Sequence, residues 1–335
     1  MLREEAQLVS KDVFSQDRSC AQLIALRDGF GKGVVRAGEK NPNVMVICAD
    51  LSESTRSLWF KEKFPERFLQ IGVAEQNMAA VASGLAAVGK IPFIASYAMF
   101  SPGRNWEQIR TTICYNNQNV KIAGAHAGIS VGPDGATHQA IEDVAITRPI
   151  ANMTVIIPAD AIEAEKATFA AAQIDGPVYI RYAREKTPVI TTERTPFEIG
   201  RAEVYYDGTD VALVASGPLV YEALRAAYIL KEKGISARVI NNHTVKPIDE
   251  KTIAQAAQEC GAIVTAEEHQ VQGGMGSAVA EIVVKTHAVP MEFVGVQNRF
   301  GESGPPDLLM DKFGLRDSNI VEAAQKAIKR KKRPA

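Results

Sequence analysis

A glutamate at the start of a predicted helix is the first residue that could do chemistry. The run Ile71–Met78 (IGVAEQNM) has the pattern of a strand end, a glycine turn and a helix whose first turn holds Glu75. A carboxylate at that position can simply complement the partial positive charge of the helix N-terminus. The position alone therefore favours a structural role, and other segments must decide whether Glu75 takes part in a reaction.

Two other segments add polar and aromatic groups. The run Gly128–Gln139 (GISVGPDGATHQ) is a glycine-rich loop that opens a helix and carries Asp134 and His138. Open α/β sheets bind ligands in such loops, at the carboxyl ends of their strands, although a flexible surface loop has the same composition. The segment Ser96–Phe100 (SYAMF) ends a predicted strand with two aromatic residues, for which core packing is an equally good explanation.

The elements that would position these residues form an alternating series. Short β-branched runs alternate with alanine-rich stretches, which is typical of parallel α/β layers. A helix is predicted over Ala74–Val88, and another follows Asp160, with Glu163 as its capping-box partner. The predicted strands are Val44–Leu51, Pro92–Tyr97, Val120–Gly124, Met153–Ile157 and Val178–Tyr182.

A second α/β series follows a break in the pattern. Glu185–Glu198, with two prolines and four threonines, is the best candidate for a linker. After it we predict strands at Val211–Ser216, Ala237–Asn241 and Ile263–Glu267, with helices over Val220–Lys233 and from Gly276. The expected fold class is α/β, with two tandem domains, residues 20–190 and 198–330, each built on a mainly parallel sheet flanked by helices.

Composition excludes several classes of function. The chain has 335 residues and a formal net charge of -1, which gives no electrostatic footprint for nucleic acid. It has no apolar run of the ~18 residues that a membrane span needs and no hydrophobic signal segment. The four cysteines and five histidines show no disulfide or metal spacing. A cytoplasmic protein without its own metal site or membrane contact is expected, and the basic run at residues 329–333 is predicted to be a solvated tail.

The runs IGVAEQNM, GISVGPDGATHQAIEDVA and DGPVYIRYAR, with the turn Ala151–Met153, together resemble the transketolase family. The resemblance is to the C-terminal half only, which comprises the pyrimidine-binding domain and the transketolase C-terminal domain. It extends over nearly the whole chain after about residue 20.

The resemblance implies thiamine diphosphate as the cofactor. Glu75 matches a catalytic glutamate that hydrogen-bonds a ring nitrogen of the aminopyrimidine, and a carboxyl group in an apolar site can share that proton. Phe100 matches an aromatic residue that stacks on the pyrimidine, with Tyr97 beside it. The family often has another aromatic residue three positions later, where this chain has Gly103.

The resemblance also implies a site for a sugar phosphate. His138, as a second catalytic residue, and Asp134 match residues that face the hydroxyl groups of the sugar. Planar guanidinium groups suit phosphate, although an ordinary surface ion pair is the alternative for each arginine. Four residues fall where the family binds the substrate phosphate: Arg27, Ser54, His126 and Arg184.

The family motif for the cofactor's diphosphate is missing. Transketolases hold that group and its divalent metal, Mg or Ca, through Gly-Asp-Gly and a later asparagine, and this chain contains no Gly-Asp-Gly. Two phosphates need donors and a metal, so a partner subunit corresponding to the N-terminal half is expected. Contact between copies of this chain would then give a heterotetramer. The sequence begins like a whole subunit, and we expect it to be one.

Three alternatives to a split transketolase remain open. The β subunit of a 2-oxoacid dehydrogenase shares the domain order and the glutamate but needs no phosphosugar site. Deoxyxylulose-phosphate synthase shares the DGxTHQ loop but has an aspartate where His126 stands and a histidine where Asn77 stands. A non-catalytic transketolase-like module would be expected to lack Glu75 or the histidine loop. The donor and acceptor sugars, and whether they belong to pentose phosphate metabolism or to the breakdown of an unusual sugar, do not follow from these residues.

The second domain has polar motifs of its own. Glu267–His269 (EEH) follows a predicted strand, and Gly273–Gly276 (GGMG) opens a helix. The glycine spacing is not that of a dinucleotide fingerprint, so a structural or interface role is predicted. His243 and His287 are likewise predicted to be non-catalytic.

Overall fold

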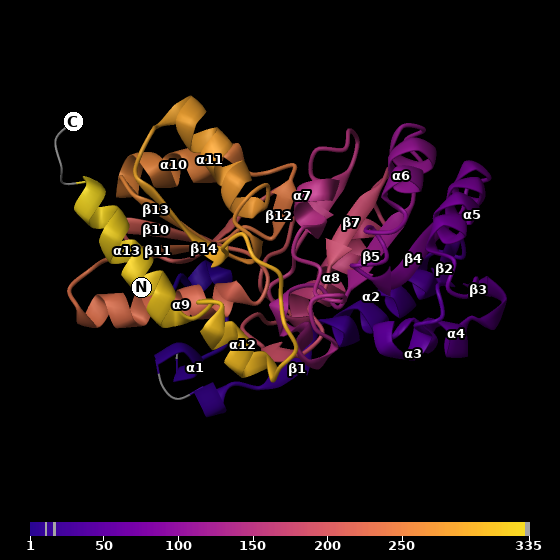
Figure 1. The fold of residues 1–335 in the computed structure, drawn as a ribbon, viewed down its shortest axis with the longest axis horizontal. Helices are drawn as coiled ribbons and strands as arrows, with labels where there is room; N and C mark the ends of the chain where they lie inside the picture. Colours follow the sequence, from indigo (N-terminus) through magenta and orange to yellow (C-terminus); the bar gives the residue numbers. More distant parts are fainter. Residues whose placement is uncertain (11, 16–17, 332–335) are drawn as a thin grey trace.

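Two sheets, one in each half of the chain, dominate the computed structural model, which describes residues 1–10, 12–15 and 18–331 (Figure 1). The seven-stranded sheet has parallel neighbours throughout except at one edge, where β12 is antiparallel. Its strands, in spatial order, are β12 (Thr244–Lys246), β6 (Thr154–Ile156), β7 (Val178–Arg181), β5 (Lys121–Ala125), β4 (Ile91–Tyr97), β2 (Val44–Cys48) and β3 (Phe68–Gln70).

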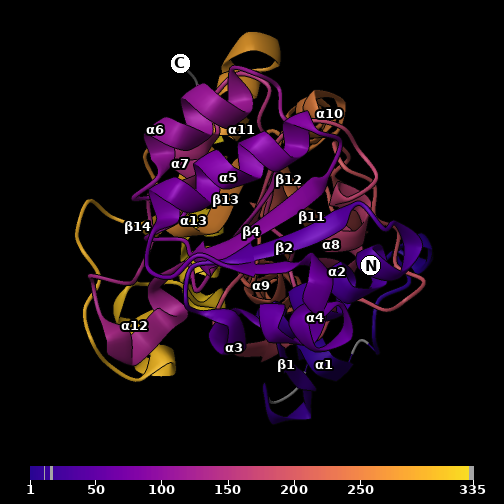
Figure 2. The same ribbon diagram turned by 90° about the vertical axis from the view of Figure 1, so that its right-hand side faces the viewer.

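Helices cover both faces of this sheet (Figure 2). The central strands are buried on both faces, so consecutive apolar residues of β2 enter different cores: Val46 packs with one set of helices and Ile47 with the other. One face carries α2 (Leu26–Lys40), α3 (Ser52–Thr55), α4 (Ser57–Lys63) and α8 (Ala161–Ala171). The other carries α5 (Glu75–Ala87), α6 (Trp106–Gln108), the π-helix Ile109–Cys114 and α7 (Asp143–Thr147).

The five-stranded sheet has the order β14 (Met291–Val296), β13 (Ile263–Gln270), β10 (Val211–Ala215), β11 (Ala237–Asn241) and β9 (Glu203–Tyr206), with only β9 antiparallel. Its helices are α9 (Leu219–Glu232), α10 (Glu250–Cys260), α11 (Met275–Thr286), α12 (Pro306–Lys312) and α13 (Asp317–Lys331). The predicted α/β class with two mainly parallel sheets is therefore confirmed.

The two halves of the chain interlock more than the sequence predicted. The three-residue strand β12 comes from the second half but pairs with β6 of the first sheet. At the other end of the chain, Ala6 and Phe14, from the short elements η1 (Glu4–Ala6) and α1 (Asp12–Ser15), are buried in the core of the five-stranded sheet. A single hydrophobic core includes Ile157 and Val245 together with Val214 under the second sheet.

The predicted linker is not a free connector. Its residues Lys186–Pro188 form β8, which pairs with β1 (Leu23–Ala25). The main-chain N–H and the hydroxyl group of Thr191 both donate to the carboxylate of Asp160, the N-cap residue of α8. A strand pairing and long-range hydrogen bonds therefore fix the path of this segment.

The basic C-terminal run also differs from its prediction. Residues 329–331 continue α13, and two of them bind back onto the protein. The guanidinium of Arg330 donates to Met291 O, and Nζ of Lys331 donates to Cys260 O. Lys332 and Arg333 lie outside the described residues. Within the described part of the chain, no helix has the length and apolarity that crossing a membrane requires.

Candidate functional site

The predicted site residues lie where the parallel strands of the seven-stranded sheet end. This side of the sheet, formed by the carboxyl ends of the strands, is called the carboxyl edge. Neighbouring parallel strands point the same way, so the loops that follow them meet at their common carboxyl ends. The strands β2, β3, β4, β5 and β7 lead, respectively, to Ser54, Glu75, Phe100, His126 and Arg184, and Tyr97 is the last residue of β4.

Glu75 begins α5 and is buried, with 1% of its surface exposed. Its carboxylate accepts a hydrogen bond from Nη1 of Arg104 at 2.7 Å, and its main-chain oxygen accepts one from the amide of Asn105. The sequence predicted apolar surroundings for this carboxyl group. The structure instead provides a cationic partner, because the turn after β4 directs Arg104 back toward α5.

An aromatic cluster connects three loops. The rings of Tyr97 and Phe100 are stacked with centroids 6.0 Å apart, and the imidazole of His126 is stacked on Tyr97 at a centroid distance of 4.0 Å. His138 meets Phe100 edge to face at 5.4 Å. These contacts place the aromatic residues of Ser96–Phe100 beside the histidine loop.

His126 is the most buried of the predicted polar residues at this edge. It has a positive φ of 56°, which an L-residue adopts only where its surroundings hold it. Burial, followed by the nearby guanidinium groups of Arg27 and Arg184, lowers the pKa of His126 to about 3. The imidazole is therefore neutral at physiological pH and can act as a hydrogen-bond partner but not as a cation.

Two cations flank this neutral ring. Nη1 of Arg27 lies 3.4 Å from Nε2 of His126 and donates to the main-chain oxygen of Ser54 at 3.1 Å. Nη1 of Arg184 donates to Val131 O at 2.6 Å. Among the described residues, neither Nε of Arg27 nor Nδ1 of His126 has a hydrogen-bond partner. Buried polar atoms without partners are rare, so these two retain unused hydrogen-bonding capacity.

The glycine-rich loop contributes the remaining two predicted residues. Asp134 lies in the 3-10 helix Ile129–Asp134 and its carboxylate is 3.5 Å from Nη1 of Arg184. Nδ1 of His138 is 2.9 Å from the hydroxyl of Thr137, so Nε2 is the ring nitrogen available to a ligand. The structure thus brings all the predicted site residues to the carboxyl edge.

Sequence reasoning missed two arginines at this edge. Arg104 contacts Glu75, as described above, and Arg56 forms an ion pair with Asp28 while helping to lower the pKa of His126. Arg56 has a positive φ of 68° between two short helices. Neither arginine stands in a recognisable motif, and only the folded chain shows that they belong to the site.

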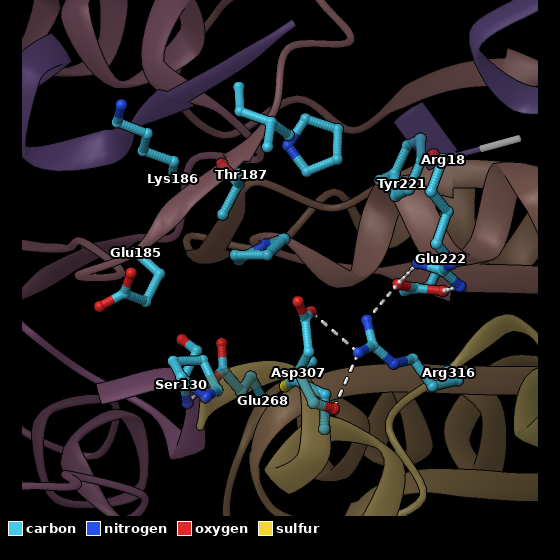
Figure 3. A pocket seen from close by; sticks show the side chains of 15 residues that line it. Arg18, Ser130, Glu185, Lys186, Thr187, Tyr221, Glu222, Glu268, Asp307 and Arg316 are labelled. Carbon is cyan, nitrogen blue, oxygen red and sulfur yellow. Dashed lines mark hydrogen bonds and ion pairs between the residues drawn. The ribbon is translucent and has the colours of Figure 1, made fainter. Parts of the chain in front are cut away.

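A separate cavity of about 220 Å³ lies between the two halves of the chain (Figure 3). Its walls include Ser130 and Glu185 from the first half and Glu222, Glu268 and Arg316 from the second. None of the predicted site residues lines it. Its arginines are already engaged, since Arg316 binds both Asp307 and Glu222. The predicted site residues therefore lie apart from this cavity.

Comparison with known proteins identifies the family. The profile described as "Transketolase, pyrimidine binding domain" matches residues 22–189, and "Transketolase, C-terminal domain" matches residues 200–320. The chain belongs to the transketolase family. It corresponds to the C-terminal half of a transketolase and is related to subunits of split transketolases.

Three relatives show how far the likeness to split transketolases extends. A solved structure described as "Split gene transketolase, inactive beta4 tetramer" has 47% identity and a TM-score of 0.87, covering 92% of this chain and all of that one. The 6-deoxy-6-sulfo-D-fructose transketolase subunit SqwH of Clostridium sp. is 41% identical, over 91% of this chain and 95% of that protein. One subunit of the apulose-4-phosphate transketolase of Phocaeicola vulgatus is 32% identical, over 92% of this chain and 99% of that protein.

Proposed function

We propose that this chain is one subunit of a thiamine-diphosphate-dependent transketolase, which moves a two-carbon ketol unit from a ketose phosphate to an aldose acceptor. The observation that carries the proposal is the convergence of a buried carboxylate and an aromatic ring. Glu75 and Phe100 come from different loops, yet one guanidinium, that of Arg104, contacts both. A flat ring that hydrogen-bonds Glu75 and stacks on Phe100 would fit between these two side chains.

The residues present suit the pyrimidine end of the cofactor. Glu75 would hydrogen-bond a ring nitrogen, and Phe100 would provide the stacking face, with Tyr97 behind it. When bound, the cofactor would supply the carbanion chemistry at its thiazolium ring. The contribution of Glu75 would be to hold or release a proton at that ring nitrogen, and burial of its carboxyl would keep water out of that exchange.

The residues present do not suit the diphosphate end. The sequence has no Gly-Asp-Gly, and the described residues include no group of three or more His, Cys, Asp or Glu that could hold a metal ion. A partner subunit corresponding to the N-terminal half would bind the diphosphate with its Mg or Ca ion. The relative described as an inactive β4 tetramer supports this division, and two copies of each subunit would make a heterotetramer.

The substrate would carry a terminal anion. Arg27 and Arg184 flank the neutral His126, and each guanidinium can donate charge-assisted hydrogen bonds to phosphate. Asp134 and His138 would face the hydroxyl groups of the sugar. Two of the relatives carry a sugar in their names, which is a phosphosugar in one and a sulfosugar in the other. A sulfonate is therefore the natural second anion to test. A 2-oxoacid dehydrogenase subunit would have no use for such a clamp.

Partner dependence tests the proposal. The purified chain alone should bind thiamine diphosphate weakly and should show no ketol transfer with ketose phosphates. Adding the N-terminal-half subunit should restore both properties, and the mass of the complex should be that of two copies of each. Full transketolase activity from the lone chain would contradict the division of the site, and inactivity of the complex with every ketose phosphate would contradict the reaction.

A further inference from the structure

Arg104 lies in the space that the pyrimidine would need. Its Nη1 donates to Oε2 of Glu75 at 2.7 Å, and its guanidinium carbon lies 4.8 Å from the centroid of the Phe100 ring. Its side chain is 48% exposed, whereas that of Glu75 is 1% exposed. The guanidinium thus fills the gap between the carboxylate and the ring from the solvent side.

The local backbone explains why an arginine reaches this place. A tight turn follows Phe100, and the main-chain N–H of Arg104 donates to Phe100 O at 2.9 Å. A Cβ atom at Gly103 would lie 2.0 Å from Met99 O, so the turn admits no side chain there. An aromatic residue at position 103 is therefore excluded from this turn, and Arg104 covers the ring face of Phe100.

We infer that Arg104 is a displaceable plug of the pyrimidine seat: it closes the seat in the lone subunit and must swing out before the cofactor's pyrimidine can enter. This inference rests on the proposed function, because it assumes that Glu75 and Phe100 form that seat. A ring placed between them would need the Oε2 atom and the ring face that Arg104 now occupies.

The contacts of Arg104 favour displacement. The described structure gives its side chain no partner other than Glu75 and Phe100, and about half of that side chain already faces solvent. Its charge can be hydrated again when it leaves, so the cost of separating the pair falls mainly on the buried carboxylate. Glu75, in contrast, is buried and needs a replacement partner. An aminopyrimidine replaces both contacts at once: its ring nitrogen and Glu75 share a proton taken up from solvent when the guanidinium leaves, and its flat ring covers Phe100.

The test uses a neutral probe, 4-amino-5-hydroxymethyl-2-methylpyrimidine, which needs neither diphosphate nor partner subunit. Isothermal titration compares its binding to the lone wild-type chain, to Arg104→Ala and to Arg110→Ala. Arg110 is exposed and lies in the next turns of the same segment, so its variant loses the same charge. We expect Arg104→Ala to bind the probe at least tenfold more tightly than wild type, and Arg110→Ala to match wild type.

Salt provides a second readout that needs no variant. Raising the ionic strength should strengthen probe binding to the wild-type chain, because it weakens the Arg104–Glu75 pair, and should leave Arg104→Ala unchanged. Arg104→Gln, which keeps a polar side chain without the charge, replaces the alanine variant if the latter melts early.

Equal or weaker probe binding by both Arg104 variants would overturn the plug, as would wild-type binding that falls with salt. The proposed function has a separate outcome. If the Arg104 variants fail in this way but the wild-type complex with the partner subunit transfers ketol units, the plug is wrong and the transketolase assignment stands. If the wild-type complex transfers none, the assignment itself fails.

Discussion

Two buried glutamates, one in each half of the chain, lie at the N-termini of helices, yet their carboxylates are used differently. Glu267, in β13, accepts hydrogen bonds from the main-chain N–H groups of Met275 and Gly276 at 2.7 and 2.8 Å, at the start of α11. Glu75 sits in the first turn of α5 but directs its carboxylate to the side chain of Arg104. One carboxylate is bound to rigid backbone, and the other to a half-exposed side chain.

The difference separates a structural carboxylate from the one that we propose to be functional. The carboxylate of Glu267 would lie 2.2 Å from a Cβ atom at Gly274, so the glycines of Gly273–Gly276 leave room for the carboxylate and not for a phosphate. Burial raises the pKa of Glu267, while its two amide donors oppose that rise. A carboxylate fixed by its own chain cannot exchange partners. A carboxylate held by a side chain can, and this supports the catalytic role proposed for Glu75.

Glu75→Gln should produce the largest effect. In the complex with the partner subunit, the substitution should lower turnover by roughly 100-fold or more, because an amide cannot hold and return the proton. The melting temperature should stay close to that of wild type. Activity near wild type together with a small loss of stability would mean that Glu75, like Glu267, only serves its helix.

Glu267→Gln should have the opposite effect, lowering the stability of the chain and not the turnover. Its amide group would present an N–H to one of two main-chain donors, and leaving a buried donor unsatisfied costs about 1–3 kcal/mol of unfolding free energy. Denaturant titration of the whole chain measures this loss. Glu281→Gln is the matched control, because Glu281 lies on the same helix, α11, with an exposed side chain. Equal stability of the two variants would remove the contrast between the glutamates.

Arg184→Ala should raise the KM for a sugar phosphate acceptor about tenfold, with a smaller change in kcat, since charge-assisted bonds to the phosphate are lost. The increase should shrink at high salt. An unphosphorylated acceptor of the same length should be affected much less, and Arg194→Ala, at an exposed position, should behave as wild type. Equal loss with both acceptors would place the phosphate elsewhere.

The smallest expected effect concerns pH. Burial lowers the pKa of both His126 and His243 to about 3. These folded-state values lie below the ordinary value, so the stability that the neutral rings contribute is present above pH ~6.5 and is lost as the pH falls toward 3. The substitution His243→Gln removes one of these titrating groups. The unfolding free energy of the variant should therefore fall less between pH 7 and pH 6 than that of wild type, by about 0.7 kcal/mol. An unchanged pH slope would mean that His243 is protonated at its ordinary pKa.

Much of the fold and of the candidate site could be predicted from the sequence, but not all of it. Tyr97 ends one predicted strand and His126 follows another, and parallel strands bring their carboxyl ends together, so the proximity of these two residues followed from the pattern. The role of Arg104 did not, because it depends on the geometry of one turn. The strand β12 was missed because three residues at a sheet edge carry no periodic signal.

The interlocked core has a consequence for exchanging parts between transketolases. Replacing everything after the segment at residues 185–198 with the same region of a relative would also replace the edge strand of the first sheet, since β12 pairs with β6. It would change Val245 and Val214, which share one core with Ile157. The boundary that is convenient along the chain is thus not a boundary in space, and the two halves would have to be exchanged together.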